Sequence, residues 1–568
     1  MTASTQTLQN KRFTLSYAGS PVWEIDGKSV TADSPVAFEQ LLSLYQKNRT
    51  EFLKCLHGHF AIILRDNEKN TLLAASDRIG VYRLYWSQTS VGDILVSTCL
   101  EDIRKQRQDT PELSADALYC YMYFHMIPTP FSIYSNIKKL PPGQCLTYEN
   151  GQVSIEPYWL PQFDEPPSAN IDTLSTNLHQ ILKDSVSGSL TDQAQYAAFL
   201  SGGLDSSTVV GVMSQLENQS THSYSIGFNA KEYDETPFAR LTAKHFGAQH
   251  HEYFVTPEDI VSAVPKIAAA YHEPFGNSSA LPVYYCAKIA AENGVQLMLA
   301  GDGGDELFGG NTRYASQRHY RYYQALPKII SRGLFDHLIN ALPSGLPLAS
   351  KAQSYIKQAN IPLPDRLQIY NFLHRHDPLE MFNRDYLQTV DTNIPLTIQR
   401  QQYSRPQNAS ELNRMLYLDW LITLADNDLR KVSSMCELAG VEVAYPLLTD
   451  ELIEFSCTVP SALKLKKGQL RYFYKYAMRE FLPQETLKKS KHGFGLPFGV
   501  WLKDYQPLRE LAHDSLSKLK TREYFNPAFI DKAQKMHEGT HASYYGELIW
   551  IMMMLELWLS THQSSYQG

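Results

Sequence analysis

The run SGGLDSS at residues 201–207 combines glycines, hydroxyls and a carboxylate as a phosphate-binding loop does. Its members are Ser201, Gly202, Gly203, Leu204, Asp205, Ser206 and Ser207. The glycines let backbone N–H groups turn toward an anion, the serines add hydroxyl donors, and the aspartate is a hard oxygen ligand suited to Mg²⁺. An apolar stretch, 196–200, precedes the run, and a helix-like segment, 206–216, follows it and would direct its N-terminal N–H groups at the same anion. The run therefore predicts a nucleotide-phosphate site, although it has no lysine and is not the GxxxxGK[ST] loop.

Three later motifs narrow the class of protein. The string GDGGDELFGG occupies 301–310, directly after the apolar stretch 296–300. The string LRKVSSMCELAGVEVAYPLLTD occupies 429–450, and KHGFGLP occupies 491–497. In this order and spacing, and together with residues 201–207, the set resembles the asparagine synthetase family. The synthetase part of that family is an ATP pyrophosphatase, which splits ATP between the α and β phosphates.

This resemblance implies a ligase that uses ATP and Mg²⁺, activates a carboxylate as an acyl-adenylate, releases pyrophosphate and then forms an amide with ammonia or an amine. Residues 201–207 would hold the β and γ phosphates, with Asp205 and Asp305 on the metal. Asp302 matches the proposed base for the attacking nitrogen, where asparagine synthetase itself usually has Glu. Lys491 matches the lysine that stabilises charge on the α-phosphate, a large effect in a dry site. With Asp305, these two residues form the candidate catalytic set, and the adenosine pocket falls on Phe199, Ile226 and Gly301.

An N-terminal set of motifs resembles the glutaminase-type domain that precedes the synthetase in that family. The matching segments are Gly58–Leu64, DRIG at 77–80, and Leu84-Tyr85. Glutamine-hydrolysing members begin, after removal of Met, with a nucleophilic cysteine, but position 2 here is Thr2. The family's Arg-Gly-Pro-Asp and Asn-Gly-Glu strings are absent, and Ala37 stands where an aspartate would hold the glutamine. Because strand character begins only near Arg12, Thr2 is not expected to replace the cysteine, and we predict a degenerate domain that hydrolyses no glutamine.

The synthetase half departs from the family at four positions. Ser433 replaces an aspartate, Cys436 a serine, Ala444 an arginine and Thr449 an aspartate, although Asp450 follows directly. Loss of a guanidinium removes a planar clamp for a carboxylate or phosphate. The nucleotide motifs are untouched, so these changes bear on the acceptor more than on adenylation.

Several acceptors and two other classes of function stay open. The carboxylate could belong to aspartate, to a sugar uronate that becomes a uronamide, to a peptide that closes to a macrolactam, or to a β-amino acid that closes to a β-lactam. A non-catalytic relative that only binds a nucleotide is a second hypothesis. A tRNA-modifying ATP pyrophosphatase is a third, but it would require a basic face and often paired cysteines, which are not visible in the sequence.

The elements that must position these residues differ between the two halves. Residues 12–159 contain short apolar or alternating runs separated by turn residues, which predicts an antiparallel, Ntn-type α+β domain. The proline-rich stretch 161–170 is predicted to be a linker. After it, short strands alternate with helices, which predicts an α/β ATP-pyrophosphatase domain over 171–568, with a parallel sheet and a helical extension from about 315.

Composition agrees with this assignment. The chain has 568 residues, and its net charge of −7 argues against a general nucleic-acid binder. Seven dispersed cysteines and a polar N-terminus indicate a cytoplasmic protein with reduced thiols. The apolar run 548–559 is too short for a bilayer and predicts a buried C-terminal helix. His245, His250 and His251 lack the companions of a metal site, and a homodimer is a further expectation from the family.

Overall fold

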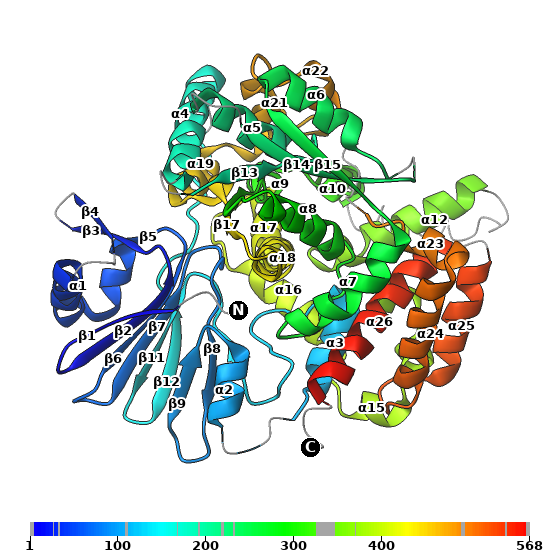
Figure 1. The fold of residues 1–568 in the computed structure, drawn as a ribbon, viewed down its shortest axis with the longest axis horizontal. Coiled ribbons are helices and arrows are strands. Elements are labelled where there is room, and N and C mark those ends of the chain that lie inside the picture. Colours follow the sequence, from blue (N-terminus) through cyan, green and yellow to red (C-terminus); the bar gives the residue numbers. More distant parts are fainter. Residues whose placement is uncertain are drawn as a thin grey trace.

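The computed structural model describes the chain apart from residues 1–4, 26–27, 32–34, 108, 110–111, 167–168, 191–193, 217–220, 231–232, 325–346, 370, 490–494, 540–541 and 564–568. An antiparallel N-terminal part is followed by a parallel sheet and then by a helical C-terminal part (Figure 1). The predicted fold class is confirmed. None of the helices in the described part of the chain is long and apolar enough to cross a bilayer.

Twelve strands build the N-terminal part among the described residues: β1 (Gln6–Gln9), β2 (Phe13–Gly19), β3 (Val22–Ile25), β4 (Lys28–Thr31), β5 (Leu56–His57), β6 (Phe60–Asp66), β7 (Thr71–Ser76), β8 (Tyr85–Gln88), β9 (Ile94–Ser97), β10 (Lys138–Lys139), β11 (Gln144–Glu149) and β12 (Gln152–Pro157). Its helices are α1 (Pro35–Asn48), η1 (Arg49–Cys55), α2 (Leu100–Gln106) and α3 (Ala115–Phe124). The largest sheet has the order β1-β2-β6-β7-β11-β12, and its pairs are antiparallel.

Side chains of β6 point alternately to the two faces of this sheet, and both faces are covered by apolar residues. Ile62 and Leu64 pack with α1 and β2, whereas Ala61 and Ile63 pack with β8 and β9. Successive side chains of a strand point to opposite faces, so one apolar strand serves two cores.

A five-stranded parallel sheet follows the linker. Its strands are β13 (Tyr196–Phe199), β14 (His222–Phe228), β15 (Gln249–Val255), β16 (Leu297–Leu299) and β17 (Glu442–Ala444). Their order is β15-β14-β13-β16-β17, and all four pairs are parallel. Helices around it include α4 (Ile171–Ser189), α5 (Leu204–Leu216), α6 (Thr236–Phe246), α7 (Pro257–Ala270) and α8 (Ala280–Glu292). Since β13 and β16 are neighbours, the two motif loops that follow them begin side by side.

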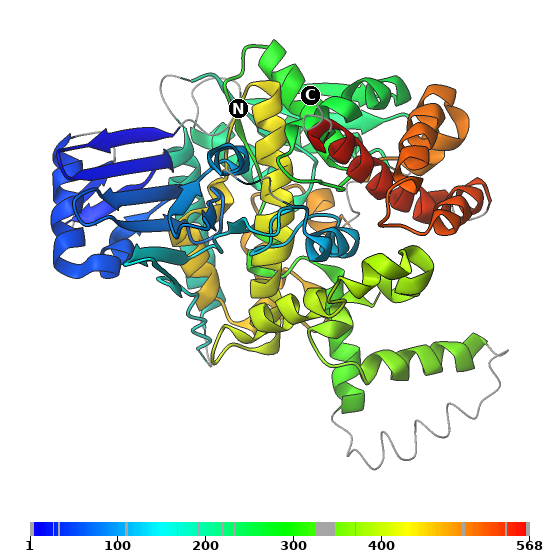
Figure 2. The ribbon, with the colours of Figure 1, turned by 90° about the horizontal axis from the view of Figure 1, so that it is seen from below.

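The remaining described elements are mostly helical. They are α9 (Gly304–Phe308), α10 (Thr312–Gln324), α12 (Pro347–Ala359), η3 (Asp365–Gln368), α13 (Phe372–Arg375), α14 (Pro378–Met381), α15 (Arg384–Gln388), α16 (Ile394–Ser404), α17 (Glu411–Asp419), η4 (Trp420–Asp428), α18 (Leu429–Ala439), η5 (Pro446–Leu448), α19 (Asp450–Thr458), α20 (Ser461–Lys464), β18 (Leu465–Lys466), β19 (Gln469–Leu470), α21 (Tyr472–Ala477), α22 (Gln484–Lys488), α23 (Phe498–Asp504), α24 (Gln506–Lys520), α25 (Pro527–Glu538) and α26 (Ala542–Gln563). Figure 2 shows η4 and α18 as one long helical rod between the N-terminal sheets and the C-terminal helices.

The apolar run 548–559 lies in α26, as predicted, and its apolar side chains are buried or nearly so. The one charge within it, Glu556, receives two hydrogen bonds from Arg522, at 2.6 and 2.9 Å. Pairing removes the cost of an isolated buried carboxylate.

Contacts between the two halves are both apolar and ionic. Helix α3 packs in the same apolar cluster as the synthetase half, and the Tyr121 hydroxyl donates to the Ile551 carbonyl at 2.8 Å. Lys139 on β10 lies 3.0 Å from Glu273, which also accepts a hydrogen bond from the Ile133 N–H. These contacts join residues before the predicted linker to residues after it, so they hold the N-terminal part on the synthetase half.

We expect Glu273→Ala to lower the free energy of unfolding by about 3–5 kcal/mol, because it leaves the buried Lys139 ammonium without its counter-charge. Urea unfolding followed by tryptophan fluorescence measures this loss. The matched control is Glu51→Ala, which breaks an exposed pair with Lys54 and should cost at most ~1 kcal/mol. Equal losses in the two variants would contradict a stabilising role for the buried pair.

The strands that were not predicted from the residues include three edge strands, β1, β15 and β17. Strand β1 is polar and lies at the sheet edge, so it lacks an apolar pattern, and strand character begins at Gln6 rather than near Arg12. Strand β15 is rich in histidine, and β17 has only three residues. Each is an edge strand of its sheet, where pairing depends on the neighbouring strand rather than on burial of its own residues.

Candidate functional site

Residues 200–203 connect β13 to α5, and residues 204–207 form the first turn of α5, so the motif 201–207 spans a strand–loop–helix junction. Hydroxyl groups close it internally: Ser206 Oγ accepts a hydrogen bond from the Ser201 N–H at 3.2 Å, and the two hydroxyls are 3.1 Å apart. Ser207 differs from the prediction, because its buried hydroxyl pairs with Thr242 at 3.0 Å and its N–H bonds the Gly203 carbonyl within the helix. The structure therefore turns Ser207 toward the core, whereas Ser201 lies on the loop and Ser206 lies beside it in the first turn of α5.

The loop that begins at Gly301 lies against the motif 201–207, because its glycines leave room for the close approach. A Cβ on Gly301 would come within 2.7 Å of the Ser206 backbone nitrogen. A Cβ on Gly304 would lie 1.9 Å from Asp205 Oδ1. Both positions exclude a side chain, so the repeated glycines of GDGGDELFGG allow the two loops to meet.

The carboxylates of Asp205 and Asp305 converge on one cation, Arg471. The Arg471 Nη1 donates to Asp205 at 2.6 Å and to Asp305 at 3.0 Å. Burial alone would lower the pKa of Arg471, but the two carboxylates outweigh burial and raise it, so the guanidinium stays charged. A positive group thus stands between the two residues predicted to bind Mg²⁺, and their hard oxygens fit that ion.

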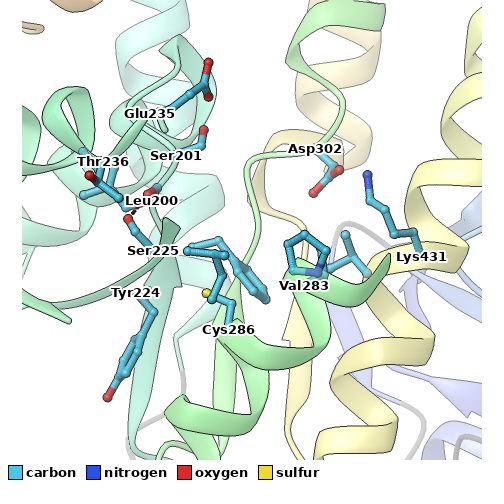
Figure 3. Close-up of a pocket in the computed structure, with 15 residues that line it drawn as sticks. Leu200, Ser201, Tyr224, Ser225, Glu235, Thr236, Val283, Cys286, Asp302 and Lys431 are labelled. Carbon is cyan, nitrogen blue, oxygen red and sulfur yellow. Dashed lines mark hydrogen bonds between the residues drawn. The ribbon is translucent and has the colours of Figure 1, made fainter. Parts of the chain in front are cut away.

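A cavity of about 210 Å³ opens beside the loop 201–207 (Figure 3). Phe199 and Ile226, predicted for the adenosine pocket, both line it. Its other apolar walls include Leu200, Ala239, Pro282, Val283, Cys286 and Val432. Ser201, Ser225, Glu235 and Thr236 line one side of it, and Asp302 and Lys431 line another. A cavity with apolar walls and a few polar groups is the usual form of a small-molecule site.

Asp302 and Lys431 lie together at one side of this cavity, and Figure 3 shows their charged groups turned toward one another. Lys431 is anchored by Asp428, 2.8 Å away. Burial raises the pKa of Asp302 to about 6, while nearby Lys431 lowers it and the Asp428 and Asp205 charges raise it. Burial would lower the pKa of Lys431, but Asp428 and Asp302 raise it above its usual value. The pair therefore offers a carboxylate that titrates near neutrality beside a fixed ammonium.

A π-helical segment, η4, brings Asp428 to this position at its junction with α18. Such segments are rare and often occur at functional sites. Around the departures noted in the sequence, the Ser433 hydroxyl bonds the Tyr445 hydroxyl at 2.7 Å, and the Thr449 hydroxyl bonds Ser185 at 2.8 Å. Asp450 accepts a hydrogen bond from the Gly58 N–H at 3.1 Å, so it serves the contact between the halves rather than the cavity.

Lys491 lies outside the described residues, so its predicted place is not tested. Lys489, two positions earlier, is described and nearly buried: it lies 3.2 Å from Glu235 and donates to the Ser201 carbonyl at 3.2 Å. Lys489 thus ties the chain directly after α22 to the phosphate loop.

Sequence reasoning missed Arg471 altogether. Its partners Asp205 and Asp305 are 266 and 166 positions away, and a lone arginine in a turn carries no signal of such contacts. Lys431 lies within the string 429–450 that resembles the family, but its place in the cavity came from the fold.

Histidines form no metal cluster in the part of the chain that the structure describes. No three His, Cys, Asp or Glu side chains gather there to hold an ion. His250 and His251 lie on β15, where His251 pairs with His222 at 3.1 Å and His250 with Ser223 at 2.9 Å. His245 lies in α6 near the Phe481 carbonyl.

Ala37, which stands where the family has a glutamine-holding aspartate, lies in the apolar core between α1 and the N-terminal sheet. Ala37 lies in α1 with no exposed surface and packs with Phe38 and Leu41. A residue buried in this way cannot contact a ligand. Thr2 lies outside the described residues.

Fold and site together define a class: an ATP-pyrophosphatase-type α/β protein preceded by a glutaminase-type antiparallel domain. The asparagine synthase family model matches residues 177–560, and the glutamine amidotransferase domain model matches residues 24–159. The chain belongs to the asparagine synthase family of ATP-dependent carbon–nitrogen ligases.

Curated relatives extend this match over nearly the whole chain. It is 25% identical over 543 residues to asparagine synthetase [glutamine-hydrolyzing] 1 of Bacillus subtilis (strain 168), covering 94% of this chain and 83% of the relative. A putative asparagine synthetase of Methanocaldococcus jannaschii is 34% identical over 298 residues, 51% of this chain and 57% of the relative. Asparagine synthetase B of Escherichia coli (strain K12) is 28% identical over 317 residues, 52% of this chain and 51% of the relative.

Proposed function

We propose that this protein adenylates a carboxylate with ATP, releases pyrophosphate, and transfers nitrogen from ammonia or an amine to the activated acyl group. The observation that supports this most directly is the meeting of the loops after β13 and β16 beside one largely apolar cavity, with Asp302 and Lys431 at one side of it. Hydrogen-bond donors for the phosphates, carboxylate ligands for a cation and a base for the attacking nitrogen thus surround one site for a nucleotide.

The chain's own residues divide the work. Ser201, Ser206 and the backbone of the loop bind the polyphosphate, and the apolar cavity walls bind the nucleoside. Asp205 and Asp305 would hold Mg²⁺, which neutralises phosphate charge when bound. Asp302, ionised above pH about 6, accepts the proton of the attacking nitrogen. Lys491 stabilises charge at the α-phosphate.

ATP–pyrophosphate exchange tests this proposal. The purified protein, with Mg²⁺, is assayed with aspartate, uronates and a cell extract as sources of acceptor, and with ammonia or glutamine as nitrogen donor. Exchange with aspartate and amide formation from ammonia would identify asparagine synthesis. Exchange only with the extract would support the chemistry with a different acceptor, such as a uronate, a peptide or a β-amino acid. No exchange under any condition would overturn the proposal in favour of a nucleotide-binding relative without catalysis.

We also propose that residues 1–160 form a glutaminase-type domain without glutaminase activity, joined by the linker 161–170 to the synthetase domain 171–568. Ala37 supports this, because its position lies in the helix core. We expect no glutamate release from glutamine above the rate of a buffer control, measured with a coupled glutamate assay. Glutamate release that Thr2→Ala abolishes would refute this prediction.

A further inference from the structure

Arg471 is buried between the two carboxylates of the candidate cation site. Its side chain is 3% exposed. Nη1 touches one oxygen of Asp205 at 2.6 Å and one oxygen of Asp305 at 3.0 Å, and Nη2 touches the other oxygen of Asp205 at 2.5 Å. A forked guanidinium on a carboxylate is a strong and directional contact, so the arginine fixes the relative positions of both acids.

The surroundings hold this guanidinium in place. The ring of Tyr474 lies 4.1 Å below it. On another side, a Cβ at Gly304 would come within 2.9 Å of Arg471 Nη2, so that residue leaves just enough room for the ion pair. The arginine itself sits in a left-handed turn, with φ 53°, at the start of α21. The backbone and the packing together aim this side chain at the acidic pair.

The guanidinium and a divalent cation exclude one another. Mg²⁺ requires oxygen ligands at about 2.0–2.1 Å, and Nη1 already occupies the space between one oxygen of Asp205 and one of Asp305. A free cation would have to expel the arginine and leave its charge buried without a partner, which is unfavourable. A polyphosphate adds negative charge that compensates the released guanidinium, so cation and nucleotide would enter together.

We propose that Arg471 is a positioning residue that holds Asp205 and Asp305 together and keeps a free divalent cation out of the site until a nucleotide is present. This inference rests on the proposed role of the site in binding a nucleotide with its cation. It adds an order to that binding, which neither the family match nor the loop motifs specify.

Binding of Mn²⁺ without nucleotide tests the proposal, with free Mn²⁺ followed by electron paramagnetic resonance. Wild-type protein should bind Mn²⁺ weakly alone and at least tenfold more tightly with α,β-methylene-ATP, after subtraction of the Mn²⁺ that the nucleotide binds in a protein-free sample. Arg471→Met should bind one Mn²⁺ at least tenfold more tightly than wild type in the absence of nucleotide, and Arg471→Lys should keep the weak binding. Adding Asp305→Asn to Arg471→Met should remove the gained site and so locate it.

Arg479→Met, at an exposed arginine two residues after α21, is the matched control and should leave Mn²⁺ binding unchanged. Tight Mn²⁺ binding by the wild type without nucleotide, or equal affinities in wild type and Arg471→Met, would overturn the proposal. The wild-type measurement needs no variant, so tight Mn²⁺ binding without nucleotide would still overturn the proposal if Arg471→Met fails to fold, and Arg471→Lys then supplies the comparison at that position. Absence of pyrophosphate exchange would instead overturn the proposed function and leave this comparison standing.

Discussion

Asp205→Ala should reduce ATP–pyrophosphate exchange by at least about a thousandfold, because a bound metal supplies several kcal/mol of charge stabilisation and each 1.4 kcal/mol is tenfold in rate. Asp205 belongs to the motif 201–207 that we propose binds polyphosphate. With Asp305 it also forms the proposed cation site. Exchange with the acceptor that supports wild-type turnover measures the loss, and calorimetric titration with Mg·α,β-methylene-ATP measures the binding defect directly.

Asp184→Ala is the control for this variant. Asp184 is an exposed aspartate of α4, bonded to the Gln180 side chain within the same helix, so its removal should leave exchange unchanged. Wild-type exchange by Asp205→Ala would contradict the assignment of the site. Lys491→Ala should abolish exchange as well, since the family lysine acts on the α-phosphate.

Asp302→Asn should separate the two half-reactions. It keeps the shape of the side chain but removes the base, so amide formation should fall by about 10²–10⁴-fold while pyrophosphate exchange stays within about threefold of wild type. Asp302→Glu, which restores the residue usual in asparagine synthetase, should retain part of the rate because it keeps a carboxylate with a longer reach. Parallel loss of both half-reactions in Asp302→Asn would contradict its role as base for nitrogen.

The pH profile supplies an independent check on Asp302. The base acts only when ionised, and burial raises the pKa of Asp302 to about 6. At equal concentrations of unprotonated ammonia or amine at each pH, amide formation by the wild type should therefore be constant above pH about 7 and fall tenfold per pH unit below about 6. The fall should be absent from the residual rate of Asp302→Asn. A wild-type profile that stays flat down to pH 4.5 would contradict the raised pKa.

Much of the local architecture followed from the sequence. The stretches predicted at 196–200, 206–216 and 548–559 fall on β13, α5 and α26, because each carries its own apolar pattern. The edge strands β1 and β17 were not predicted, since each is stabilised by hydrogen bonds to its neighbouring strand rather than by an apolar pattern of its own. The same limit hid the shared core of α3 with the C-terminal helices.

The candidate site divides in the same way. Phe199 and Ile226 were assigned to the nucleoside pocket from the family match, and both line the cavity. Ser207 was assigned to the phosphate loop by its neighbours in sequence, yet the helical turn directs its hydroxyl into the core. Helical periodicity explains the difference, because residues adjacent in sequence face directions about 100° apart on a helix.

The sequence by itself determined the family, the class of fold and the nucleotide loop, because SGGLDSS and GDGGDELFGG are contiguous strings whose chemistry is local. Tertiary structure alone decided which charged groups meet. It brought Arg471 between Asp205 and Asp305, set Lys431 opposite Asp302, and buried Ala37 in a helix core. The physical reason is that charges interact strongly only within a few ångströms. The fold brings together residues that are hundreds of positions apart, and the sequence does not show which of them will meet.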